Sequence, residues 1–503
     1  MGAEGGRIGA HGWQRRDRPA LFPHPAVSPV TSTWCSPTVG GLGAVPTIPG
    51  VLPSLLAHGT AGLAGEGVPV AVVYAIVVVG AALLALALRA RGAAPVGGPA
   101  VAPLSLDGAE CGPWPGDGLG APARLALQAL GVAALAFALA TGWFGSELSG
   151  ANPAPLLLLA VGWWAVPALS WLLGDWWRLV DPYDALAAVV DRVRGRPAPG
   201  PEGLVGADAD EPGDWWVPAL LLASFAWLVT CWPDGLRPRA MAAWLAALTV
   251  LMLAGAVLGG RAWVRRTSPL AVVAGTVAAA SPLSWAGGRP RLRSPFRGLA
   301  ARAGGRRSLA ALVVVLGATV WEATAGSQWW ADLAGLGDDA GAVLWSTVGL
   351  AWAVLLVGAA WVGIVRLAEV VADRRGGPER VEPLAPDLAA ALGPLAVVAA
   401  VAHQLGSLLV DVQDLVVLAL DPFAEGWDLF DSYSWRANEQ LLSPATLGWV
   451  QVGLLAAALG VGLVGAWDRA IARLGPAVAE AGWVLAGWTA AAGAVGVWLL
   501  LGA

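Results

Sequence analysis

One stretch of the chain, residues 401–432, combines a long apolar run with side chains that could do chemistry. His403, Gln404 and Ser407 follow one another closely in it, and Asp414 comes further along. On a continuous helix of 3.6 residues per turn, His403, Ser407 and Asp414 would point in nearly the same direction. An imidazole beside a carboxylate could bind a metal ion or pass a proton.

A second carboxylate, Glu322, follows Trp321 in another apolar run and has no evident partner nearby in the sequence. An ionisable side chain at membrane depth is costly unless it faces a polar cavity or a partner, so it is a candidate site residue. We therefore predict His403, Glu322 and Asp414 as catalytic residues. Further polar candidates are Gln404, Ser407, Asp411 and Asn152, the last of which opens a predicted span in the segment ANPAP.

A structural interpretation of the same residues stays open. His403 would then hydrogen-bond to a neighbouring helix, and Asp411 and Asp414 would be solvated residues at the membrane interface. The segment 421–432, DPFAEGWDLFDS, begins with an Asp-Pro turn signal and alternates aromatic residues with acids. It is either a cap over an outer cavity or an interfacial loop, which Trp427 and Phe430 would equally explain.

The composition places these residues in a membrane protein. Hydrophobic residues make up 57% of the 503 residues and charged residues only 13%, unlike the balance of a soluble domain. All 30 basic residues are arginine, and the three cysteines form no CxxC or Cys/His motif, which argues against a zinc site or a disulfide framework. The HExxH and GxSxG motifs are absent, and a P-loop would need a lysine. We expect no nucleic-acid partner.

Apolar runs of about 18–25 residues recur along the chain, and this is the length a helix needs to cross the hydrocarbon layer. They predict an all-α polytopic membrane protein with about ten transmembrane helices in one domain, 58–503. Residues 1–57 are expected to be a disordered or mis-annotated extension, of which 1–50 would not be translated if the true start is Val51. The run 267–285 is expected to be an interfacial or re-entrant helix. The ten spans are predicted near 69–88, 125–144, 154–173, 215–232, 240–258, 308–325, 341–365, 388–410, 445–465 and 478–501.

The arginines predict how the chain is threaded. With both termini outside, the predicted outer loops hold only Arg237, Arg239 and Arg436, and the other arginines after the extension lie in inner loops. This is the asymmetry of the positive-inside rule. The chain is also tryptophan-rich, with 29 tryptophans and several pairs at span ends, as in aromatic belts. We expect a multi-pass protein of the plasma membrane, surrounded by lipid and acting on a small-molecule substrate; its oligomeric state stays open.

Several short segments, in the order and spacing given at the end of this paragraph, resemble a family of bacterial and archaeal polytopic membrane proteins often labelled fenitrothion hydrolase. One segment departs from the family pattern, since DPYDAL stands where an Asn-Pro and a basic residue would be expected. The segments are AHG (57–59), ANPAP (151–155), GDWWRLVDPYDAL (174–186), SPL with RSPFRGLA (281–300), Trp321-Glu322, AHQLGSLL (402–409), and DPFAEGWDLF with LLSP (421–444).

The resemblance implies metal-dependent hydrolysis of a phosphotriester to a phenol and a diester. That chemistry uses a water activated by one or two metal ions, usually held by several histidines. Outside the extension the chain offers His58 and His403, to which Glu322, Asp414 or Asp428 could add carboxylates. A divalent metal would be the cofactor. The same polar cluster could instead bind an ion or small solute in a transporter, or handle a metal in a membrane accessory protein.

Overall fold

The protein is described by a computed structural model that covers residues 69–92, 95–96, 119–196, 213–286, 289–301, 304–334, 339–376 and 383–501. All of these belong to one compact unit, Gly50–Ala503. The predicted extension 1–57 lies outside the described residues, and so does His58.

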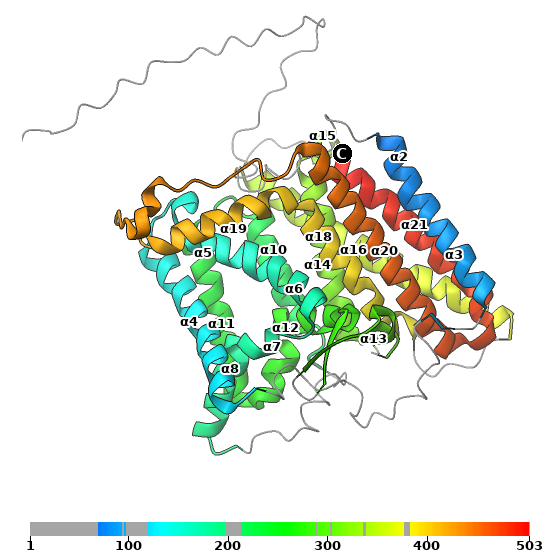
Figure 1. The fold of residues 1–503 in the computed structure, drawn as a ribbon, viewed down its shortest axis with the longest axis horizontal. Helices are drawn as coiled ribbons and strands as arrows, with labels where there is room; N and C mark the ends of the chain where they lie inside the picture. Colours follow the sequence, from blue (N-terminus) through cyan, green and yellow to red (C-terminus); the bar gives the residue numbers. More distant parts are fainter. Residues whose placement is uncertain are drawn as a thin grey trace, which may run out of the picture. The chain divides into compact units, whose positions relative to one another are not determined.

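The described part is almost entirely helical (Figure 1), which confirms the all-α class. One antiparallel hairpin joins β1 (Leu283–Ala286) to β2 (Arg289–Leu292), with Leu283 opposite Leu292. The first half of the chain forms α2 (Val70–Tyr74), α3 (Gly80–Arg91), α4 (Ala121–Phe144), α5 (Pro153–Leu156), α6 (Val166–Leu173), α7 (Trp177–Val180), α8 (Pro182–Val193), α10 (Val217–Cys231), α11 (Pro238–Thr267) and α12 (Pro269–Val277). The second half forms α13 (Pro295–Ala301), α14 (Arg306–Ala325), α15 (Gln328–Ala334), α16 (Asp339–Arg374), α17 (Leu384–Asp387), α18 (Gly393–His403), α19 (Leu405–Leu420), α20 (Pro444–Leu474) and α21 (Val478–Leu501).

Short segments of other helical types connect these helices. The turns are wider, as in a π-helix, in η1 (Ala75–Val79) and η4 (Leu157–Ala165). Such π-helical segments are rare and often lie at functional sites. The 3-10 segments are η3 (Ser149–Ala151), η6 (Ala278–Ala280), η7 (Ala389–Leu392), η8 (Leu429–Ser434) and η9 (Gly475–Ala477).

Within the described residues, seven helical segments are long and apolar enough to cross a membrane, and a bent pair makes an eighth. One of the seven, Pro444–Trp498, has 55 residues, about 82 Å at 1.5 Å per residue, which far exceeds the hydrocarbon layer. It contains α20 and α21, which are separated at Gly475 and pack against each other. The membrane class is therefore confirmed, while the number of spans and their orientation stay predictions.

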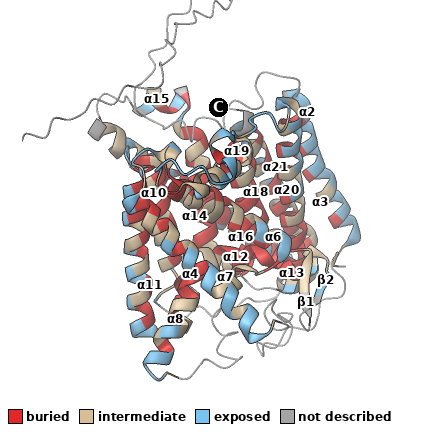
Figure 2. Cartoon of the chain, turned by 60° about the vertical axis from the view of Figure 1, so that its left-hand side comes forward, coloured by how far each residue is buried: buried red, intermediate tan, exposed pale blue. Residues whose placement is uncertain are grey.

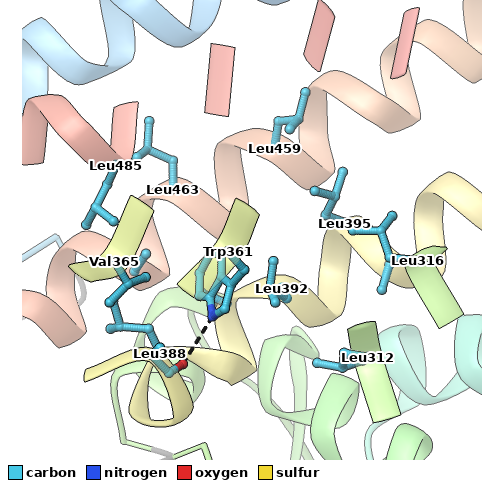
Figure 3. Packing of buried hydrophobic residues seen from close by; sticks show 14 of the residues in the cluster. Leu312, Leu316, Trp361, Val365, Leu388, Leu392, Leu395, Leu459, Leu463 and Leu485 are labelled. Atoms are coloured by element: carbon cyan, nitrogen blue, oxygen red, sulfur yellow. Dashed lines mark hydrogen bonds between the residues drawn. The ribbon is translucent and has the colours of Figure 1, made fainter. Parts of the chain in front are cut away.

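The core lies around α14 and α18. In the most apolar 18-residue stretch of α14, 67% of the residues are buried, against 28% in the corresponding stretch of α4. α14 is therefore a central helix. Figure 3 shows Leu312 and Leu316 of α14 packed near Leu395 of α18. In the same cluster Trp361 donates a hydrogen bond to the Ala385 carbonyl at 3.1 Å, which ties α16 to α17.

The peripheral helices expose apolar side chains instead. Leu83 on α3 is 61% exposed and Leu258 on α11 is 82% exposed, and Figure 2 shows exposed residues along α2, α3 and α11. An apolar surface of this kind is stable against lipid tails and costly against water. These helices therefore carry an apolar outer surface.

The run 267–285 is not one continuous helix. It begins with α12, whose nine residues rise only about 14 Å, less than half of the hydrocarbon layer. The chain then passes through η6 into the hairpin. Arg293 donates to the carbonyls of Ala278, Ala279 and Ser281 and so satisfies the end of this short helix. That this segment lies at the membrane interface or re-enters the membrane stays a prediction.

Candidate functional site

The predicted span 388–410 is broken at Gln404. α18 ends at His403, and α19 leaves at an angle of 72°. Gln404 has φ −101° and ψ 11°, outside the values of a regular helix. The expectation of one continuous helix is therefore wrong: α19 turns aside and contacts α5 and η4 (Figure 1).

A broken helix leaves backbone groups without their helical partners, and inside a membrane these groups must be satisfied by the protein. Gln451, a buried residue of α20, supplies one such partner. Its Nε2 donates to the Ala402 carbonyl oxygen at 2.7 Å. The bend is therefore held by a side chain from another helix.

Glu322, near the end of α14, finds its partner at the same bend. Nε2 of Gln404 donates to Oε1 of Glu322 at 2.5 Å. The Gln404 side chain is completely buried, and the residue is 82 positions away from Glu322 in the chain. The sequence shows no local partner for Glu322, and the fold provides a distant one.

Several polar atoms at this bend have no hydrogen-bond partner among the described residues. They are Oε1 of Gln404, Oε1 of Gln451 and Oγ of Ser407, all buried. His403 is also buried at this bend, 5% exposed. We call Glu322, His403, Gln404, Ser407 and Gln451 the elbow site. A buried polar atom without a partner is unusual and indicates a ligand, water or ion.

The bend also separates residues that the sequence placed together. Asp414 lies on α19, about 15 Å along the helix from Gln404 at 1.5 Å per residue, and it is half-exposed. Asp411 is buried on α19, 7% exposed. The prediction that His403, Ser407 and Asp414 share one helix face is therefore wrong. Ser407 lies near the elbow, and Asp414 does not.

The predicted metal ligands that the structure describes, Glu322, His403 and Asp428, do not form one group. No group of three or more His, Cys, Asp or Glu side chains that could hold a metal ion is found among the described residues. Asp428 is exposed in the segment after α19, whereas Glu322 and His403 lie at the elbow. His58 is outside the described residues, so its part in a metal site stays a prediction.

Asn152 is fully occupied by backbone hydrogen bonds. Its Oδ1 accepts from the Ala154 N–H at 2.9 Å and caps α5, and its Nδ2 donates to the carbonyls of Thr141 and Ser146, both at 2.8 Å. These bonds tie the end of α4 to the start of α5. Asn152 is a structural residue rather than a free ligand.

Sequence reasoning missed a second polar cluster, around α8. Asp184 accepts two hydrogen bonds from Arg261 at 2.7 Å and two from Arg265 at 2.6 and 3.0 Å. Burial alone would raise the pKa of Asp184, but the two guanidinium groups outweigh it and lower that pKa. The segment DPYDAL (181–186) provides this carboxylate. The Asp-Pro helix start at 181–182 was the available signal.

The same cluster stabilises a break in α11 at Gly260, where φ is 71° and ψ is −173°. The left-handed φ favours glycine. Arg196 donates to the carbonyls of Ala256, Val257 and Leu258, which lose helical partners at the break. On the other side of the break, the Arg261 N–H donates to Asp191 at 2.9 Å. Both ends of the broken helix are satisfied by residues in or next to α8.

Asp181, at the start of α8, is expected to make stability depend on pH. Burial raises its pKa from 3.8 to about 7, the charge of Asp184 adds to this, and bonds from Tyr183, Asp184 and Ser268 oppose it. Between about pH 4 and pH 7, the Asp181 carboxyl group is therefore protonated in the folded chain and has lost its proton in the unfolded chain. Stability should fall by up to about 4 kcal/mol as the pH rises from about 4 to 7, and stay level above that.

The test is a thermal melt in detergent between pH 4 and pH 8. Asp181→Asn should flatten the slope between pH 4 and 7, because its amide cannot lose the proton. Asp234→Asn, at an exposed ion pair, serves as the control and should keep the wild-type slope. Equal slopes for Asp181→Asn and wild type would contradict the assignment.

Comparison of this chain with protein-family models, curated proteins and solved structures finds no match.

Proposed function

We propose that the protein is a transporter that binds an ion or small solute at the elbow site and carries it across the plasma membrane. The observation behind this proposal is the helix broken at Gln404, with the buried Glu322–Gln404 pair beside it. Discontinuous helices at membrane depth are typical of transporter binding sites, because the break exposes backbone and side-chain groups to a solute. A buried carboxylate can then bind a cation or exchange a proton.

The proposal includes the predicted threading. Ten helical segments cross the membrane, and both termini face outside. Support comes from the arginines, which concentrate on one side of the predicted spans, and from the ten apolar runs, each of which coincides with one helix or with two or three consecutive helical segments. In this threading α14 and α18 both run outward, and the elbow lies in the outer half.

A flux assay tests the transporter. Purified protein is reconstituted into liposomes loaded with a pH-sensitive dye, and pools of small amines, carboxylates or sugars are added outside. Wild type should give solute-dependent flux, and Glu322→Gln should lose it by at least about tenfold, because a bond to a charged group is worth about 1.5–3 kcal/mol. The substitution keeps the size of the side chain and its ability to bond to Gln404.

The matched control is Glu147→Gln. Glu147 forms an exposed ion pair with Arg239 on the same predicted side, so its loss should leave flux unchanged. Flux that is equal in wild type and Glu322→Gln would contradict a role of the elbow site. No flux with any pool would contradict the transporter.

Phosphotriester hydrolysis, which the family resemblance implies, is the competing outcome. It has less support because the described residues bring together only one histidine and one carboxylate at the elbow. Detergent-purified protein that releases a phenol from a phosphotriester only with added zinc, cobalt or manganese would favour the hydrolase. In that case Glu322→Gln should lower the rate, and bound metal should be measurable in wild type.

A further inference from the structure

We infer that the solute of the elbow site is a small cation that carries N–H groups, either ammonium or a primary alkylammonium ion. The inference rests on the proposed function, since it names the solute class of the same site. It starts from two buried amide oxygens, Oε1 of Gln404 and Oε1 of Gln451, which no described residue satisfies.

The orientation of both amides follows from the chemistry of their partners. Nε2 of Gln404 faces Glu322, and a carboxylate accepts hydrogen bonds. Nε2 of Gln451 faces the Ala402 carbonyl, which also only accepts. In each side chain the nitrogen is therefore committed, and the oxygen must point elsewhere.

The elbow site consequently presents an excess of acceptors. One amide oxygen without a donor belongs to the side chain that bonds Glu322, and the other belongs to the side chain that bonds the Ala402 carbonyl, two residues before Gln404. A buried acceptor without a partner is costly. The complementary ligand has several N–H donors and a positive charge. An anion would be repelled by Glu322, and a hard metal ion such as sodium, which oxygen ligands also hold, is the competing occupant that the sodium probe below tests.

The neighbourhood of the site sets the size of the ligand. A small apolar cavity of about 10 Å³ lies between α14, α18 and α12 and is lined by Val315, Val397 and Ala400, among others. Val315 and Val397 come seven residues before Glu322 and Gln404, about 10 Å along the helix axis, so this cavity is separate from the elbow site. The acceptors themselves belong to Gln404 and Gln451, which are 0% and 3% exposed. Such enclosure suits a compact cation with a short alkyl group at most.

Binding is measured on the purified full-length protein by calorimetry and by the melting midpoint. The probes are the chloride salts of ammonium, methylammonium, tetramethylammonium and sodium at equal ionic strength. Ammonium or methylammonium should bind saturably to wild type. Tetramethylammonium has the same charge as methylammonium but no N–H group, and neither it nor sodium should bind. Tight binding of ammonium alone identifies an ammonium site, and tight binding of methylammonium identifies an amine site.

Two variants locate the binding. Gln404→Leu should weaken binding by at least about tenfold, because it removes an acceptor of a charged donor. Gln413→Leu is the matched control on α19, since both ends of the Gln413 amide are occupied by Leu409 and Asn438. It should bind like wild type. If Gln404→Leu does not fold, the comparison of methylammonium with tetramethylammonium on wild type still decides the matter.

The two proposals fail in different ways. No saturable binding of either N–H cation, or equal binding of tetramethylammonium or sodium, would overturn this inference. Flux of a solute without an N–H cation would leave the transporter standing and overturn only the solute class. Amine binding that depends on Gln404, in a protein without flux, would support the inference about the ligand and overturn the transporter.

Discussion

Asp184→Ala is expected to destabilise the protein by about 3–5 kcal/mol, the cost of removing one partner from a buried ion pair. The Asp184 side chain is 4% exposed, and its partners Arg261 and Arg265 are 19% and 14% exposed. Alanine would leave two guanidinium groups without their carboxylate. Because Arg261 follows the break at Gly260, the packing of α8 against α11 should loosen as well.

The measurement is chemical or thermal unfolding in detergent, with three variants compared. Asp184→Asn should lower the free energy of unfolding less than Asp184→Ala does, because the amide oxygen still accepts a hydrogen bond from one guanidinium group. Glu147→Ala breaks an exposed ion pair in which both side chains are more than half exposed. Such a pair contributes at most about 1 kcal/mol. If Asp184→Ala and Glu147→Ala lost the same stability, the cluster around α8 would not be a structural anchor.

Gly131→Ala is expected to cost about 3 kcal/mol or more, at the upper end of overpacking effects. Gly131 lies on α4, and a Cβ atom there would stand 1.7 Å from the Val180 carbonyl oxygen. The obstacle is backbone, so no side-chain rotation relieves it. The chain around Val180 would have to move, and with it Asp181 at the start of α8.

Gly453→Ala gives the matched comparison. Gly453 is in α20, and nothing lies within 4 Å of its added Cβ. Alanine there should be neutral, or should stabilise by up to about 1 kcal/mol through helix propensity. A Gly131→Ala variant that melts like Gly453→Ala would show that α4 does not approach the Val180 carbonyl closely.

Much of the helical framework could be predicted from the sequence, because hydrophobic length is a local property. Each predicted apolar run coincides with one helix or with two or three consecutive helical segments. The failures occur where a distant partner decides the geometry. The bend at Gln404 depends on Glu322 and Gln451, which come from other helices, and the helix-wheel argument for Asp414 assumed that no such bend existed.

The glycines illustrate the same limit. The Gly255-xxx-Gly259 spacing is typical of close packing between two helices. In the structure the indole ring of Trp263 occupies the space beside both glycines, so they accommodate the continuation of their own chain. The spacing indicates that another group packs closely against the two glycines, but it does not identify that group. The partners of Asp181 and Asp184 were hidden for the same reason, since they lie 77 to 87 residues further along the chain.

Because α19 is a separate helix that begins at the bend, a small rotation at Gln404 would displace the far end of α19 by several ångströms. The helix has 16 residues and is therefore about 24 Å long, so a rotation of about 10° at Gln404 would move its far end by about 4 Å. At that end Asp421 accepts the N–H groups of Glu425 and Gly426, at 2.9 and 2.8 Å, which couples the start of the acidic loop to the helix. A rearrangement of the buried Glu322–Gln404 hydrogen bond would thus produce a larger displacement of the acidic loop that follows α19.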